Sequence, residues 1–138
     1  MALAEVDITE KLKKADMRPT RQRIMLGSLL WANGCNRHVT AELLHSEARQ
    51  ANMQVSMATV YNTLHQFVEA KLLREVVVDG GRSYFDTNTM PHHHFLYEES
   101  GELEDIPAEN ITLGSIPSPT KEAGKVSSVD VIIRVKAH

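Results

Sequence analysis

The chain has 138 residues, of which 42% are hydrophobic and 24% are charged. This composition fits one globular domain or two small lobes and argues against a disordered or fibrous protein. A single cysteine, Cys35, excludes an intramolecular disulfide and a four-cysteine structural zinc site within one chain. Because no apolar run approaches the ~18 residues of a membrane span and no signal peptide is evident, we expect a cytoplasmic protein without a membrane partner.

The net charge of −3 conceals an asymmetry along the chain. Residues 1–86 carry 11 Lys and Arg against 10 Asp and Glu, whereas residues 87–138 carry 4 against 8. Basic residues concentrate between Lys11 and Arg23, where Asp16 is the only acidic residue. One end of the molecule could therefore attract a polyanion that the other end would repel, although a solvated helix face is the simpler alternative.

The first 70 residues have the pattern of helices separated by turns. Ile8, Leu12 and Ala15 have helical spacing, and Pro19 then breaks the pattern because the residue before proline avoids the helical region. Asn33-Gly34 is a typical helix end. The other predicted helices and their N-caps are residues 21–32 after Thr20, 41–50 after Thr40 and 57–70 after Ser56.

The fourth helix has two distinct faces and is followed by a hairpin. An apolar stripe faces the core, and the residues that project away from it are polar and nearly uncharged. Asp79-Gly80-Gly81 is a strong turn signal between strands over residues 74–78 and 82–86. Helices followed by a two-stranded wing predict a winged helix-turn-helix. The stripe consists of Val60, Leu64, Phe67 and Val68, and the outer face of Tyr61, Asn62, His65, Gln66 and Glu69.

Short strands dominate the remainder of the chain. Residues 93–97 and 103–106 flank a turn at Ser100-Gly101, residues 129–136 alternate between apolar and polar, and residues 110–125 predict a loop. A sheet of this size cannot bury its apolar face alone, so this lobe is expected to dimerise. We expect an α+β chain with a winged-helix DNA-binding domain over residues 1–86 and a small, mostly β dimerisation and ligand-sensing domain over residues 87–138.

The N-terminal end of the fourth helix carries side chains suited to reading DNA. A major groove about 12 Å wide accepts one helix, and residues near its N-terminal end reach the bases. Ser56, Thr59, Tyr61 and Asn62 supply hydroxyls for phosphate, an aromatic edge for a thymine methyl and an amide for adenine. The helix could instead merely face water, but the wing and the basic first helix favour DNA.

His92, His93 and His94 form a run that could bind a metal ion. In an extended chain alternate residues share a side, so His92 and His94 could approach one ion while His93 points elsewhere. Imidazole suits zinc, iron, manganese and haem iron. Asp86 and His38 are plausible further ligands, and solvated polar histidines are the alternative.

Five motifs occur in order along the chain: Arg18-Pro-Thr-Arg-Gln-Arg23, His38-Val-Thr-Ala-Glu42, Ala58-Thr-Val-Tyr61, Gly80-Gly-Arg-Ser-Tyr-Phe85 and His92-His-His94. With these motifs the chain resembles the ferric uptake regulator (Fur) family of metal-sensing repressors over about residues 12–101. The resemblance implies a homodimer with an N-terminal winged-helix lobe, a C-terminal dimerisation lobe and a regulatory metal site at the hinge. It implies hinge ligands at His38, Asp86, His92 or His93, and His94, with base contacts at Thr59 and Tyr61 and DNA contacts by Lys14 and Arg18.

Departures from the family pattern are also informative. Glu98-Glu99-Ser100-Gly101 stands where most relatives begin their Cys-x-x-Cys pairs, His-His-His-Phe95 shortens the usual hinge motif, and Asn62 stands where arginine is more common. The helix of the second lobe is replaced by Ile116-Pro117-Ser118-Pro119. These departures resemble the iron response regulator (Irr) branch, which responds to haem bound by its histidines.

The resemblance thus implies an iron- and haem-responsive transcriptional regulator. Its homodimer would bind an A·T-rich, pseudo-palindromic operator in double-stranded DNA and lose affinity when haem binds at His92, His93 and His94. One alternative is a repressor activated by Fe, Mn or Zn at His38, Asp86 and the histidines; another is a haem or metal carrier without DNA activity. No catalytic triad or buried acidic pair is evident, so we do not expect an enzyme.

Overall fold

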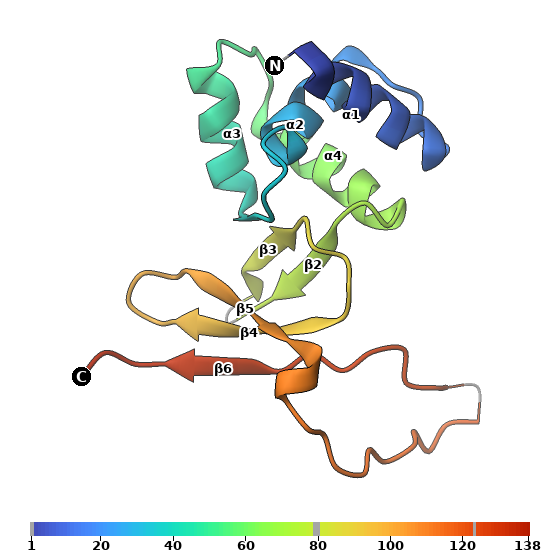
Figure 1. Ribbon diagram of the computed structural model, residues 1–138, viewed down its shortest axis with the longest axis vertical. Coiled ribbons are helices and arrows are strands. Elements are labelled where there is room, and N and C mark those ends of the chain that lie inside the picture. The colour runs from blue at the N-terminus through green and yellow to red at the C-terminus, as the bar shows by residue number, and fades with distance from the viewer. Residues whose placement is uncertain (1, 79–80, 123) are drawn as a thin grey trace. The chain divides into compact units, whose positions relative to one another are not determined.

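The computed structural model of the chain describes residues 2–78, 81–122 and 124–138. Its contacts divide the chain into two compact units, residues 1–89 and residues 90–138. Figure 1 shows the helices confined to the first unit, apart from one short 3₁₀ turn in the second. The elements of the first unit are α1 (Ala2–Lys14), α2 (Arg21–Trp31), β1 (His38–Val39), α3 (Ala41–Gln50), α4 (Met57–Glu69), β2 (Arg74–Val77) and β3 (Ser83–Asp86). Those of the second unit are β4 (His92–Tyr97), β5 (Leu103–Pro107), η2 (Ala108–Asn110) and β6 (Ile132–Val135).

Side-chain hydroxyls begin three of the helices, as the sequence predicts. Thr20 accepts a hydrogen bond from the backbone N–H of Arg23 at 3.3 Å. Thr40 and Ser56 accept the corresponding backbone hydrogen bonds at the starts of α3 and α4, each at a distance of 3.1 Å. Each cap satisfies an N–H that the first helical turn leaves without a partner, which typically contributes about 1 kcal/mol.

The core of the first unit lies between α4 and the other helices. Val60, Leu64 and Phe67 of α4 are fully buried, and Phe67 packs against the ring of Trp31 at a centroid distance of 5.1 Å. Val68 is partly buried against the same core. This burial confirms the predicted apolar stripe, and each side chain removed from water contributes about 1.5 to 3 kcal/mol.

The wing is an antiparallel sheet in the order β1, β3, β2. Phe85 of the central strand pairs with Val39 on one side and with Glu75 on the other. The short strand β1 is an addition that periodicity did not indicate. The predicted turn residues Asp79 and Gly80 lie outside the described residues. The helices and this wing together form the expected winged helix-turn-helix.

The second unit is a sheet in the order β5, β4, β6. β4 runs antiparallel to β5 and parallel to β6, a relation that requires a long connection. Gly101, with φ of +76°, makes the predicted turn between β4 and β5, a conformation that glycine adopts at little cost. β6 covers only part of the predicted alternating segment, residues 129–136.

The connection between η2 and β6 is exposed and has no regular secondary structure among its described residues. This agrees with the loop expected over residues 110–125. Exposed apolar side chains along it and on β6 include Ile116, Val126, Val129 and Ile133. Within the described residues, no helix has the length and apolar character needed to span a bilayer.

Candidate metal centre and nucleic-acid surface

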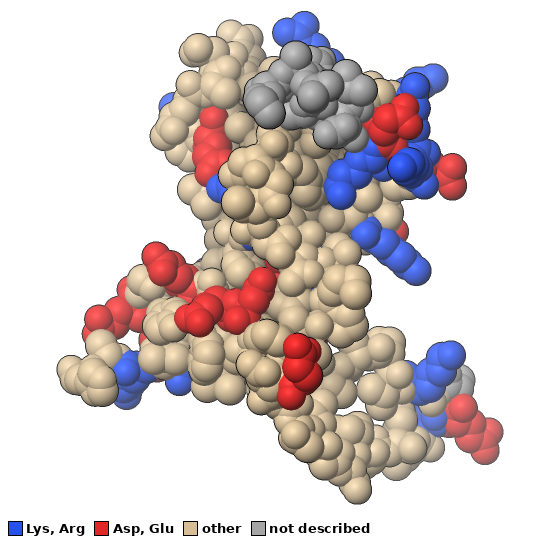
Figure 2. Space-filling model, viewed as in Figure 1, with Lys and Arg blue, Asp and Glu red and all other residues tan. Residues whose placement is uncertain are grey.

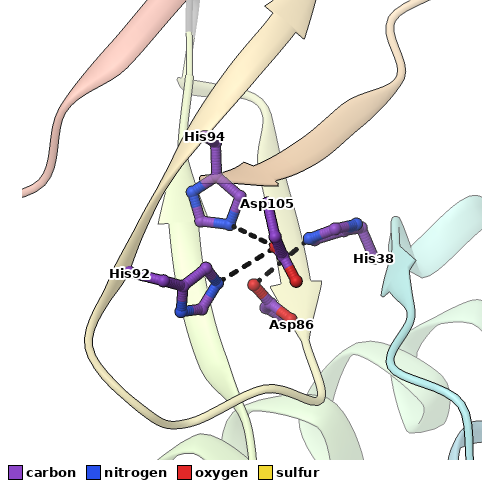
Figure 3. Close-up of side chains that lie close together, drawn as sticks. All are labelled: His38, Asp86, His92, His94 and Asp105. Atoms are coloured by element: carbon purple, nitrogen blue, oxygen red, sulfur yellow. Dashed lines mark ion pairs between the residues drawn. The ribbon is translucent and has the colours of Figure 1, made fainter. Parts of the chain in front are cut away.

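Two histidines and one aspartate of the second unit converge on a single point. His92 and His94 are alternate residues of β4 and therefore project from the same face of the sheet. Asp105 of β5 pairs directly with His94, so its carboxylate lies on that face as well. Asp105 Oδ1 is 3.2 Å from Nε2 of His92 and 3.4 Å from Nε2 of His94 (Figure 3). One ligand atom from each of the three residues lies within 4.8 Å of the others.

The protonation of His92 makes this convergence chemically informative. Nδ1 of His92 lies 2.5 Å from the backbone carbonyl oxygen of Met90. A carbonyl can only accept, so Nδ1 carries the proton and donates it. In the neutral ring Nε2 then has a lone pair, and it faces the Asp105 oxygen. At this separation the two atoms can either form an ion pair, if the ring takes up a second proton, or both bind one metal ion.

The two imidazoles are buried and the carboxylate is half-buried. His92 and His94 are 4% and 2% exposed, and the side chain of Asp105 is 30% exposed. Water therefore has little access to the imidazoles, whereas the carboxylate can be reached from solvent. The position of this triad on two hydrogen-bonded strands also fixes its geometry.

His93 projects from the opposite face of β4. Its Nδ1 accepts a hydrogen bond from the backbone N–H of Val131 at 3.0 Å. This contact ties β4 to the segment that leads into β6. The structure therefore brings His92 and His94 together with Asp105 and leaves His93 outside this group.

His38 and Asp86 form a second pair, in the first unit. They are direct partners in the β1–β3 register, and Nε2 of His38 lies 3.3 Å from Oδ2 of Asp86 (Figure 3). Asp86 is fully buried and accepts a hydrogen bond from the backbone N–H of Asn88 at 2.9 Å. Imidazole and carboxylate together are again a donor set suited to a divalent metal ion.

Arg37 holds the backbone beside this pair. Its guanidinium forms a two-pronged ion pair with Glu47 of α3, at 3.0 and 2.6 Å, and donates to the carbonyl of Leu29 at 2.8 Å. The hydrogen bonds that Arg37 donates to Glu47 raise the pKa of Arg37, so this arginine stays charged. The backbone of Arg37 also exchanges hydrogen bonds with Thr87, at 2.8 and 3.0 Å. The backbone is thereby held in place next to His38 and next to Asp86.

Asp105 is the site residue that the sequence analysis missed. The segment 103–106 was predicted as a strand, but nothing in its periodicity tells which of its acidic residues faces the histidines. Antiparallel pairing around the Ser100-Gly101 turn supplies that information, because it sets Asp105 opposite His94. Counting residues outward from this turn gives the strand register, and that is the sequence signal that identifies Asp105.

The predicted DNA-contacting residues lie on the first unit. Tyr61 is 45% exposed, Asn62 beside it is exposed, and Thr59 is partly exposed. Ser56 caps α4 and donates its hydroxyl to Thr59 Oγ1 at 2.9 Å, so these two hydroxyls form one polar group at the helix start. Lys14 and Arg18 are exposed near the end of α1.

Charge is unevenly distributed within each unit. In Figure 2 the Lys and Arg side chains of the first unit gather on the side of α1, whose last turn carries Lys11, Lys13 and Lys14. In the second unit Asp and Glu gather around the turn between β4 and β5, which includes Glu98, Glu99 and Glu102. A phosphate backbone would be attracted to the first of these surfaces and repelled by the second.

Comparison with known proteins identifies the family of this chain. The sequence pattern of the "Ferric uptake regulator family" matches residues 14–134. The ferric uptake regulation protein of Vibrio anguillarum is 30% identical over 106 residues, which cover 76% of this chain and 70% of that protein. Across the curated relatives, the matched stretch spans between 62% and 71% of the relative's own length.

Solved structures show the same fold. The ferric uptake regulator of Vibrio cholerae superimposes with a TM-score of 0.71 at 22% identity, covering 94% of this chain and 98% of that one. The regulator from Pseudomonas aeruginosa, solved with manganese, gives 0.68 at 22% identity, covering 94% and 97%. The match over residues 14–134 establishes that this chain belongs to the ferric uptake regulator family of metal-responsive transcriptional regulators, and not to a class of enzymes.

Proposed function

We propose that the protein is a homodimeric, operator-binding regulator whose DNA affinity is set by a ligand held at His92, His94 and Asp105. The observation that carries this proposal is the convergence of three donor atoms: Nε2 of His92 and Nε2 of His94 lie 3.2 and 3.4 Å from Oδ1 of Asp105. Imidazole nitrogens and a carboxylate oxygen this close together are a donor set that a divalent metal ion accepts.

A divalent metal ion fits these donors best. Two imidazoles and a carboxylate are ligands accepted by Fe²⁺, Mn²⁺ and Zn²⁺. We further propose that His38 and Asp86 complete the coordination. Asp86 ends β3 and His92 begins β4, so a connection of five residues, about 20 Å at full extension, keeps the two pairs within reach. Manganese in the Pseudomonas aeruginosa structure supports Mn²⁺ as a probe.

The proposed DNA surface is the N-terminal part of α4 with the basic side of α1. Ser56, Thr59, Tyr61 and Asn62 would enter the major groove, and Lys14 and Arg18 would contact the backbone. In this proposal residues 1–86 bind DNA and residues 87–138 dimerise and sense the ligand. The exposed apolar residues Val126, Val129 and Ile133 support the assignment of dimerisation to the second unit. The operator would be an A·T-rich pseudo-palindrome, read in the cytoplasm.

Haem is the second candidate ligand. The run of histidines and the absence of cysteine beyond Cys35 are the features that favour it, since imidazole ligation of haem iron is common. In that case haem at His92, His93 and His94 would lower DNA affinity, whereas a metal corepressor would raise it. The carboxylate of Asp105 between two of the rings favours the metal ion over haem.

One titration separates these possibilities. Operator duplexes are selected from a random-sequence library by the full-length protein, and their affinity is then measured with added Mn²⁺, Zn²⁺ or haemin. A rise in affinity with Mn²⁺ or Zn²⁺ that His92→Ala abolishes supports a metal corepressor. A fall with haemin that the same substitution abolishes supports haem sensing.

A carrier without DNA activity would give a different result. It would bind the ligand but retain no duplex above background at any salt concentration, whereas phosphate contacts make true DNA binding fall steeply with salt. Ligand binding unaffected by the combined His92→Ala and His94→Ala substitutions would refute the proposed site. An unchanged DNA affinity under all ligands would refute regulation through it.

A further inference from the structure

Tyr61 is the exposed aromatic residue of α4, and its ring does not stand alone in solvent. The ring of His65, one helical turn further on, lies 4.5 Å from it between centroids, with the planes inclined at 53°. Residues at this spacing share a helix face, and the later side chain leans back over the earlier one. His65 therefore covers one side of Tyr61.

Phe85 contacts both of these rings. Its ring lies 5.5 Å from His65 at 88° and 6.5 Å from Tyr61 at 85°, both edge-to-face contacts. Aromatic pairs at these separations and angles attract each other through their ring quadrupoles. Tyr61, His65 and Phe85 together form one aromatic cluster, hereafter the Tyr61 cluster.

Phe85 is the rigid member of the Tyr61 cluster. Phe85 is fully buried in β3, the central strand of the wing sheet, where Val39 and Glu75 are its neighbours across the two ladders. A buried aromatic side chain on a strand paired on both sides has little freedom to move. His65 is partly buried, so it connects a fixed ring to an exposed one.

We propose that His65 is a positioning residue for DNA reading: it holds the Tyr61 ring against Phe85 in the orientation that enters the groove. This inference rests on the proposed function, in which Tyr61 contacts bases. An exposed tyrosine without such support would sample several rotamers and would have to be ordered on binding. Removing that support should weaken operator affinity roughly 2- to 10-fold, the usual effect of immobilising one side chain.

The test compares three full-length variants with the wild type. His65→Leu replaces the ring by an apolar side chain of similar size, His65→Phe keeps a ring at this position, and Glu69→Gln is a control on the exposed side of the same helix. Affinity is measured for the selected operator and for an unrelated duplex of equal length, with and without Mn²⁺. Thermal unfolding of each variant is recorded in parallel.

The expected result is a loss of operator affinity in His65→Leu, with unchanged affinity for the unrelated duplex and a melting temperature like that of the wild type. His65→Phe should recover most of the loss, and Glu69→Gln should show none. In a Tyr61→Ala background, His65→Leu should have no further effect, because there is then no ring to position.

The inference is overturned by an operator affinity unaffected by His65→Leu, by an equal loss on both duplexes, or by an undiminished loss in the Tyr61→Ala background. A wild-type protein that does not distinguish the operator from the unrelated duplex refutes the proposed function and this inference with it. Sequence preference that depends on Tyr61 but not on His65 refutes the inference alone.

Discussion

Asp105→Asn is the substitution that tests the metal centre most directly. It keeps the shape of the side chain but removes the charge that faces His92 at 3.2 Å and His94 at 3.4 Å. Without metal, the new amide can donate to the lone pair of His92 Nε2. We therefore expect the metal-free melting temperature to change little, because this hydrogen bond replaces the contact between Asp105 and His92.

The loss in metal affinity can be estimated. Substituting even an outer-shell partner of a metal ligand commonly costs 10- to 100-fold in affinity, and a direct carboxylate ligand should cost at least that. At a free metal concentration of 100 times the wild-type Kd, binding stabilises the wild type by about 2.7 kcal/mol but the variant by only about 0.4 to 1.4 kcal/mol. At roughly 3 to 5 °C per kcal/mol for a chain of this size, the metal-bound melting temperature should fall by about 4 to 12 °C.

Calorimetric titration with Mn²⁺ and thermal unfolding with and without the ion measure both quantities. Glu104→Gln is the matched control, because it removes the same charge from the adjacent residue of β5, which is exposed. If Asp105→Asn binds Mn²⁺ within threefold of the wild type, or if the control loses as much affinity, the carboxylate is not a ligand. A metal-free variant that is markedly less stable would show that the Asp105 charge stabilises the fold even without a metal ion.

Other consequences of the structure can be measured separately. Glu47→Ala should lower the free energy of unfolding, measured in urea, by about 1 to 3 kcal/mol. This is less than the ~3 to 5 kcal/mol expected for a fully buried ion pair, because the Arg37 and Glu47 side chains are 22% and 26% exposed. An unchanged urea midpoint would show that the Arg37–Glu47 ion pair does not stabilise the fold. Phe67→Ala should cost about 3 to 5 kcal/mol in the same assay, because Phe67 is fully buried against Trp31, and a loss below 1 kcal/mol would contradict the packing described. The hydrogen bond from the Tyr97 hydroxyl to Glu104 raises the pKa of Tyr97; deprotonation followed by ultraviolet absorbance should therefore move to lower pH in Glu104→Gln, and a shift in the other direction would mean that the carboxylate does not hold the phenolic proton.

Local sequence signals were sufficient for much of the fold. Hydroxyl residues at Thr20, Thr40 and Ser56 mark helix starts because each satisfies a backbone N–H within its own turn, an interaction that needs no distant partner. The helical period of α4 separates the buried Phe67 from the exposed Tyr61, since residues on one helix share a geometry set by 3.6 residues per turn. The shared face of His92 and His94 likewise follows from strand pleating alone.

Contacts between residues far apart in the chain determined the remaining features of the fold and of the site. Asp105 joins the histidines because the β4–β5 register places it opposite His94, and β1 exists only because β3 offers its edge to His38 and Val39. The parallel alignment of β6 and the aromatic contacts of Phe85 similarly join residues far apart in the chain. Periodicity describes which way a side chain points from its own backbone, whereas a binding site also requires the partner that faces it, and that partner is determined only when strands pair and helices pack.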